Sequence, residues 1–199
     1  MLSATQIALL AAGVGVVLVT PGPTNTLLAS AGLRYGLRRA LPLIGAELTG
    51  YLIAISAWGR FFARVADAWP WLPSLLRIAA ALYIAWLAVQ MWRAAVALPG
   101  STQRAGNLRT LFVATLLNPK ALLFGGTIFP AVAFMEWPAY LFSMLIFVAL
   151  AAPIAFGWIA FGAALGSGRL GWLEPSKVQR GASIVLGVFS LSLAWAALH

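Results

Sequence analysis

This chain of 199 residues has no cysteine, a single histidine at position 199 and only four acidic residues. Without cysteine, disulfides, thiolate metal sites and thiol redox chemistry are excluded, and soft metal ions lose their preferred ligands. An enzyme active site needs a nucleophile with a base, or metal ligands, gathered in a cleft. So few residues of these kinds predict a protein that is not an enzyme, with no catalytic residues, no metal site and no cofactor. A GxxxxGK[ST] loop is also missing, so ATP hydrolysis would require another chain.

Charged residues are scarce as well, at 9% of the chain, whereas 62% of the residues are hydrophobic and the mean hydropathy is +0.94. A soluble domain is roughly half apolar and about a quarter charged. The composition therefore predicts an integral membrane protein whose surroundings are the lipid bilayer. The net charge of +9 comes from basic residues that cluster between apolar runs. This placement indicates control of membrane orientation rather than binding of nucleic acid.

The apolar runs predict an all-α protein with six transmembrane helices, because a span needs about 20 mainly apolar residues. The expected spans cover approximately residues 5–33, 40–59, 73–92, 108–134, 139–165 and 181–198. The most polar stretch, residues 97–107, separates two halves of three spans each. We expect a single transmembrane domain, 1–199, with repeat one at about 1–98 and repeat two at about 107–199. With three spans per half, the second half enters from the opposite side, as in inverted-repeat transporters.

The basic residues also predict an orientation. Nine of them lie in the loops after the first, third and fifth spans, and three lie in the alternate loops. Cytoplasmic loops carry the excess of Lys and Arg, so both termini are expected on the periplasmic side. We expect the first apolar run to be retained rather than cleaved, because no basic residue precedes it.

The first span of each half contains a helix breaker, "TPGPTNT" at residues 20–26 and "LLNPK" at residues 116–120. Proline costs roughly 3 kcal/mol in a helix interior, and hydrocarbon offers no water to the freed carbonyls. A straight helix over residues 5–34 would be about 44 Å long, longer than the hydrocarbon core of about 30 Å. Matched interruptions in both halves indicate the binding site of a secondary transporter. A proline kink whose polar neighbours only cap the broken ends is the alternative.

Two ionisable residues, Glu47 and Lys120, lie inside predicted spans. Helical rise places Glu47 about 12 Å from Arg39 and Lys120 about 16 Å from Arg109, so both are expected near the midplane. Each charge costs about 2.5–3.5 kcal/mol there. Three interpretations stay open. The two residues form a structural ion pair, or they bind the two ends of a zwitterion. In the third, Glu47 titrates and couples proton movement to the solute, because burial disfavours a charged carboxylate.

Several glycines indicate helix packing. Gly32 and Gly36 have a spacing that allows close helix approach, although neighbouring arginines make a turn at the membrane edge an equal alternative. Gly45 and Gly50 are expected to let the second span pack near the first break.

At these residues the sequence resembles the LysE superfamily of exporters, and most of all its homoserine/threonine exporter branch. Four segments carry the resemblance in order: "TPGPTNTLLASAGLRYGLRRA", "GAELTG", "AALYIAWLAVQMWRA" and "LLNPKALLF". Each is moderately specific, and together they extend over nearly the whole chain. Two departures are Glu47, where family members tend to carry a neutral residue such as Gln, and Ala88, where they often have glycine.

The resemblance implies a bacterial inner-membrane exporter of amino acids or close derivatives, driven by the electrochemical gradient. It also implies important roles for the residues that match the two proline motifs, which are Pro21, Gly22, Pro23, Asn118, Pro119 and Lys120. The polar residues at the first break and the intramembrane charge add Thr24, Asn25 and Glu47. The predicted transport site consists of these nine residues.

Other functions stay open at this point. The chain could export another small solute or a metal cation, or serve as a non-transporting scaffold subunit of a larger complex. The expected partners are an amino-acid-like solute and the bilayer, and the oligomeric state is open, a homo-oligomer included.

Overall fold

The computed structural model describes residues 2–65 and 107–167 continuously, and individual positions between 68 and 93 and between 180 and 195. Within these residues there is no strand, so the predicted all-α class is confirmed. The helices are α1 (Ala4–Val19), α2 (Pro23–Ala40), α3 (Pro42–Val65), α5 (Leu108–Leu116), α6 (Pro119–Leu123), the π-helix η1 (Phe124–Ile128), α7 (Val132–Met135) and α8 (Trp137–Gly166). Ala88 and the linker over residues 97–106 lie outside the described residues.

Both predicted interruptions occur at the proline motifs. The chain bends by 55° between α1 and α2, and by 41° between α5 and the continuous segment formed by α6 and η1. Pro23 and Pro119 each stand at the start of the helix that follows the break. Proline suits this position because its missing N–H would have no partner there and its φ is already helical. The local sequence therefore both ends one helix and begins the next.

By length and hydropathy, α8 is the one described helix that could cross a membrane unaided. Up to three described spans result if each bent pair counts as a single crossing. The third and sixth predicted spans fall largely outside the described residues, but their described positions from Ser74 to Arg93 and from Arg180 to Trp195 are helical. The six-span count and the inverted repeat remain predictions.

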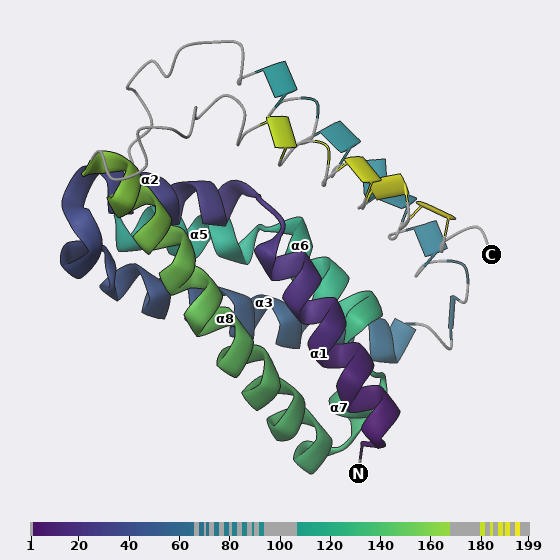
Figure 1. The fold of residues 1–199 in the computed structure, drawn as a ribbon. Coiled ribbons are helices and arrows are strands. Elements are labelled where there is room, and N and C mark those ends of the chain that lie inside the picture. Colours follow the sequence, from purple (N-terminus) through teal and green to yellow (C-terminus); the bar gives the residue numbers. More distant parts are fainter. Residues whose placement is uncertain are drawn as a thin grey trace.

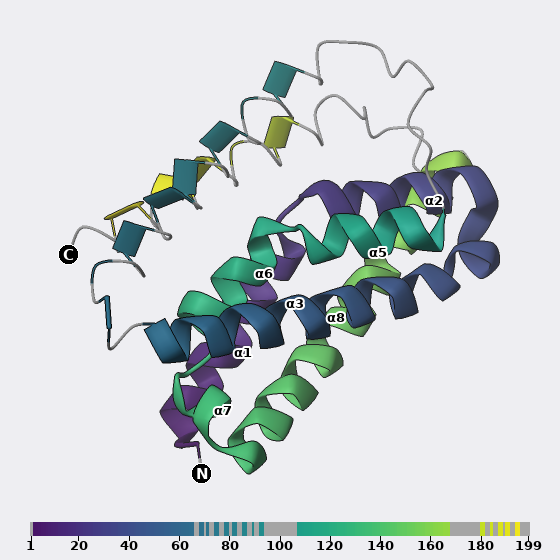
Figure 2. The same ribbon diagram turned by 180° about the vertical axis from the view of Figure 1, so that it is seen from behind.

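These two partly described segments lie side by side (Figures 1 and 2). The Ser190 hydroxyl donates a hydrogen bond of 2.8 Å to the Ala81 carbonyl. The Arg180 guanidinium lies 5.5 Å from the ring centroid of Trp92. The third predicted span therefore contacts the sixth predicted span at these residues.

Helix α8 runs the length of the bundle, from α2 at one end to α7 and the N-terminus at the other (Figure 1). Its contact with α2 depends on glycine. A Cβ on Gly162 would collide with the Ala29 carbonyl, and one on Gly32 would collide with the Ile159 carbonyl. Small residues of this kind let membrane helices approach closely. Gly36 has a different role, because its φ of 74° turns the chain near the end of α2.

The two glycines of α3 have different surroundings. A Cβ on Gly50 would lie 2.8 Å from Cβ of Thr115, so Gly50 allows α3 to pack against α5. Nothing lies within 4 Å of the corresponding position on Gly45, so its predicted packing role is wrong.

Two hydrophobic clusters fill the bundle. The aromatic cluster lies toward the α7 end and includes Tyr51, Phe124, Phe129 and Phe147, together with Leu10 and Val14 of α1. The aliphatic cluster lies toward the turn between α2 and α3 and includes Leu28, Leu43, Leu111 and Ile159. Seen from behind, α3 runs beside α5 and the α6–η1 segment, so it connects both clusters (Figure 2). The two helix breaks lie between them.

Candidate transport site

Nearly all buried polar side chains that the structure describes gather at the two breaks. They are Thr20, Thr24, Asn25, Glu47, Thr115, Asn118 and Lys120, each at most 5% exposed; Ser143 and Ser190 lie elsewhere. We call Thr20, Thr24, Asn25, Glu47, Tyr51, Asn118 and Lys120 the polar cluster. Its members come from both halves of the sequence.

At the first break, Asn25 supplies the donors that the end of α1 lacks. Its Nδ2 donates to the Leu18 carbonyl at 2.7 Å and to the Thr20 carbonyl at 2.9 Å. The last carbonyls of a helix have no hydrogen-bond donor within the helix, and in hydrocarbon no water is present to donate to them. The Asn25 side chain therefore folds back from α2 to cap α1.

Lys120 reaches the same helix end from the second half of the chain. Its ammonium group donates a hydrogen bond to the Thr20 carbonyl. The C-terminal end of a helix carries a partial negative charge that favours a cation. Gly22 makes this approach possible, since a Cβ at residue 22 would lie 3.0 Å from Cε of Lys120. The Pro-Gly-Pro motif thus provides both the break and the space for the lysine.

At the second break, Asn118 uses both ends of its amide. Its Oδ1 accepts from the Lys120 backbone N–H at 3.0 Å and so caps the start of α6. Its Nδ2 donates to the Tyr51 hydroxyl at 3.0 Å and to Oγ1 of Thr24 at 3.3 Å. Asn118 therefore joins α6 to α3 and to α2.

Glu47 contributes the acidic group of the polar cluster and is 3% exposed. Thr24 and Lys120 are neighbouring polar side chains that act on its carboxyl group. The hydrogen bond of the lysine ammonium goes to the Thr20 carbonyl. The two opposite charges therefore share one buried region without being each other's hydrogen-bond partner.

The two helices that start at the breaks have different first turns. In α6 the Asn118 side chain caps the first turn, whereas in α2 the N-cap residue is Gly22, with no side-chain cap. The positive end of the α2 dipole therefore lies beside Gly22, which is in contact with the Lys120 side chain.

The structure brings all nine predicted site residues to the two breaks. Pro21, Pro23 and Pro119 are half-buried, and the other six are buried. Their roles in transport remain predictions. The predicted set omitted Tyr51 and the Thr20 carbonyl. Tyr51 follows Glu47 by four residues on the same helix, so it shares a face with the glutamate, and this spacing could have identified it.

Comparison with known proteins gives the family. The sequence matches the family model for LysE type translocator over residues 15–199. An uncharacterized membrane protein of Vibrio cholerae is 30% identical over 162 residues, which are 74% of this chain and 76% of that protein. The homoserine/homoserine lactone efflux protein of Salmonella typhimurium is 34% identical over 59% of this chain and 58% of its own length.

The protein of the same name in Salmonella typhi is 34% identical over 54% of this chain and 48% of its own length. This chain thus spans about half the length of these two efflux proteins. No solved structure matches it. Because the family model extends over most of the sequence, the chain belongs to the LysE type translocator family and is a transporter rather than an enzyme.

Proposed function

We propose that this protein is a secondary-active exporter that moves amino acids or close derivatives across the bacterial inner membrane by alternating access, driven by the proton-motive force. The family and the names of two relatives support an amino-acid-type solute. The observation that carries the proposal is the meeting of two broken helices at one buried cluster that contains both Glu47 and Lys120.

Helix capping alone does not account for these two charges. Asn25 already caps the end of α1, and Asn118 caps the start of α6. An intramembrane charge costs about 2.5–3.5 kcal/mol, and such residues mark substrate or ion pathways. Glu47 and Lys120 are therefore best explained by a charged solute that both residues recognise.

In the proposed site the two ends of an amino acid bind different groups. The carboxylate binds near Lys120 and the uncapped first turn of α2, where the ammonium group and the helix dipole both favour an anion. The amino group binds near Glu47 and the Thr20 carbonyl. In the structure Lys120 donates to the Thr20 carbonyl. A bound zwitterion would replace this contact, because its carboxylate would bind the lysine ammonium and its amino group would bind the carbonyl.

The proposed architecture has six spans in two inverted repeats, with both termini in the periplasm and the loops after the first, third and fifth spans in the cytoplasm. The two breaks support this architecture, because each one bends the helix pair that stands first in its half. Alternating access would then rock one repeat against the other around the polar cluster.

The test is uptake of labelled solutes by inverted membrane vesicles, with and without a pH gradient. The panel holds amino acids, homoserine, amino-acid amides that lack a carboxylate, and a divalent metal ion. The wild type is expected to accumulate one class of amino acid when the gradient is present. Lys120→Ala should abolish uptake, whereas Lys177→Ala, a change of the chain's other lysine, should leave it unchanged.

Glu47→Gln separates the interpretations of the glutamate. If Glu47 couples proton movement, this variant loses accumulation against the gradient but keeps exchange of solute for solute. If Glu47 binds only the amino group, both activities fall together. Absence of uptake of every solute by inserted, folded wild-type protein contradicts the exporter proposal and leaves the scaffold alternative. Uptake of the metal ion alone assigns the site to a cation.

A further inference from the structure

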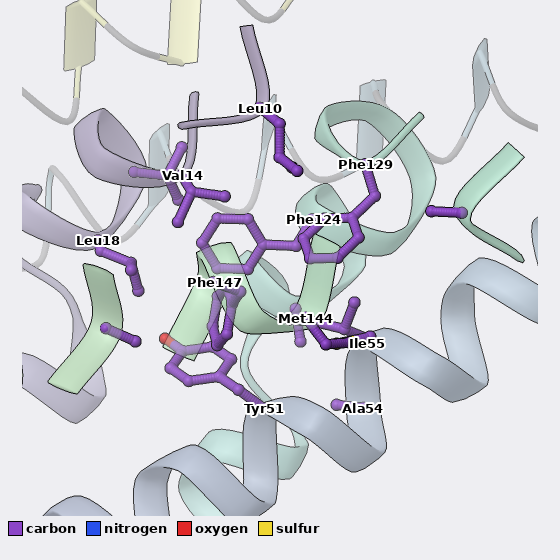
Figure 3. Packing of buried hydrophobic residues seen from close by; sticks show 14 residues of the cluster. Leu10, Val14, Leu18, Tyr51, Ala54, Ile55, Phe124, Phe129, Met144 and Phe147 are labelled. Atoms are coloured by element: carbon purple, nitrogen blue, oxygen red, sulfur yellow. The ribbon is translucent and has the colours of Figure 1, made fainter. Parts of the chain in front are cut away.

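Tyr51 joins the polar cluster to the aromatic cluster. Its ring is fully buried and packs edge-to-face against Phe124 at 5.8 Å and Phe147 at 5.5 Å between centroids. Phe124 and Phe147 also contact each other edge-to-face at 5.2 Å. The three rings come from α3, the start of η1 and α8. Figure 3 shows this group, with the Tyr51 hydroxyl at its edge.

The Tyr51 hydroxyl has hydrogen-bond partners at both helix breaks, Asn118 and Thr24. The Asn118 amide N–H can only donate, so the Tyr51 oxygen accepts from it at 3.0 Å. The phenol hydrogen is then available to Oγ1 of Thr24, 3.4 Å away. Thr24 is in turn a neighbour of the Glu47 carboxyl group. The position of the Tyr51 ring is therefore linked to the residues that are proposed to contact the solute.

The aromatic cluster occupies the space between the polar cluster and the α7 end. Leu10 and Val14 of α1, Phe129 after η1 and Met144 of α8 complete it on that side. A solute that leaves the polar cluster toward α7 has to separate these elements. Because Tyr51 belongs to both clusters, its ring and the two rings in contact with it form the first layer that the solute would meet.

We propose that Tyr51 is a positioning residue for export: its hydroxyl bonds to Asn118 and Thr24 hold the aromatic cluster closed toward the α7 end. This inference rests on the proposed function, because it treats the α7 end as one of the two exits of a transporter. A solute that binds Asn118 or Thr24 removes the partners of the hydroxyl. The ring is then free to move with Phe124 and Phe147, so occupancy of the polar cluster favours opening.

The natural absence of cysteine allows a direct test with single-cysteine reporters. Ala54→Cys places a thiol on α3 inside the aromatic cluster, where residue 54 is 3% exposed. Ser3→Cys places one at the exposed start of the chain, near α7 (Figure 1). A membrane-impermeant thiol reagent is applied from the side on which Ser3→Cys reacts, so the test does not depend on the predicted orientation.

Tyr51→Phe keeps the ring and removes the hydroxyl. We expect it to raise the labelling rate of Ala54→Cys about fivefold or more, the change that follows from loss of one neutral hydrogen bond in the closed state. The matched control is Tyr140→Phe. The Tyr140 hydroxyl bonds to Oγ of Ser56, also on α3, at 2.7 Å, but lies outside the polar cluster. This variant should leave the labelling rate unchanged.

Equal labelling in the wild type and Tyr51→Phe overturns the inference, as does an equal rise in Tyr140→Phe, which would show general loosening. If Ala54→Cys fails to fold, Ala133→Cys on α7, also fully buried, takes its place. Labelling needs no transported solute. A labelling difference without uptake shows that Tyr51 holds the aromatic cluster closed but removes both its role in export and the exporter proposal. Uptake without a labelling difference keeps the exporter proposal and removes the inference about Tyr51.

Discussion

Asn25 shows what a break in a membrane helix demands of a single side chain. Its amide donates to two carbonyls at the end of α1, and the Thr20 hydroxyl donates to the Val16 carbonyl at 2.6 Å. A buried carbonyl left without a donor costs about 1–3 kcal/mol. The polar residues around "TPGPTNT" therefore stabilise the break whether or not a solute is bound.

Replacement of Asn25 by alanine is expected to lower the free energy of unfolding by about 1–3 kcal/mol, because Leu18 loses its donor and Thr20 keeps only Lys120. Thermal unfolding in detergent measures the effect. Thr26→Ala is the control from the same turn. Residue 26 is exposed, and the Gly22 carbonyl that accepts from its hydroxyl also accepts from its backbone N–H, so this change should stay within about 0.5 kcal/mol. Similar losses in both variants would contradict the capping role of Asn25.

At the scale of elements, the packing of α2 on α8 shows that glycines in similar sequence settings have different roles. On α8, Gly162 faces the Ala29 carbonyl, while Gly157 has nothing within 4 Å of an added Cβ. On α2, Gly32 packs against α8 and Gly36 turns the chain. From spacing alone, close helix approach and a turn are alternatives for Gly32 and Gly36. The structure shows close approach at Gly32 and a turn at Gly36.

Gly162→Ala should destabilise the protein by about 1–3 kcal/mol, the usual cost of overpacking, because two backbones would have to separate. Gly157→Ala on the same helix should be neutral or stabilising by up to about 1 kcal/mol. Thermal unfolding of the two variants side by side decides the matter. An equal response at both positions would mean that the α2–α8 contact tolerates a methyl group.

For the whole molecule, the sequence predicted what is local and missed what depends on helix rotation. Proline chemistry is local, so both breaks occur where they were expected. The cost of intramembrane charge singled out Glu47 and Lys120 as candidate site residues, and both are buried at the breaks. Tyr51 was missed because its polar partners come from α2 and from the start of α6, and packing decides which face of α3 meets them. Gly45 was misjudged for the same reason.

The predicted inverted arrangement places the chain start and the central linker on opposite sides of the membrane, because three spans separate them. With the natural cysteine-free background, Ser3→Cys should react with an impermeant thiol reagent on intact cells. Ser101→Cys should react only after permeabilisation. Reaction of both from the same side would mean an even number of crossings in the first half and would contradict the inverted repeat.

The hydrogen bond from Lys120 to Thr20 joins residues that are 100 positions apart, and this has a consequence for biosynthesis. At about 5–20 residues per second, the first break is made roughly 5–20 s before its lysine. Asn25 is already present in that interval and can hold the end of α1 alone. We therefore expect Asn25 alone to cap α1 while the first half enters the bilayer, and Lys120 to add its hydrogen bond once the second half has been made.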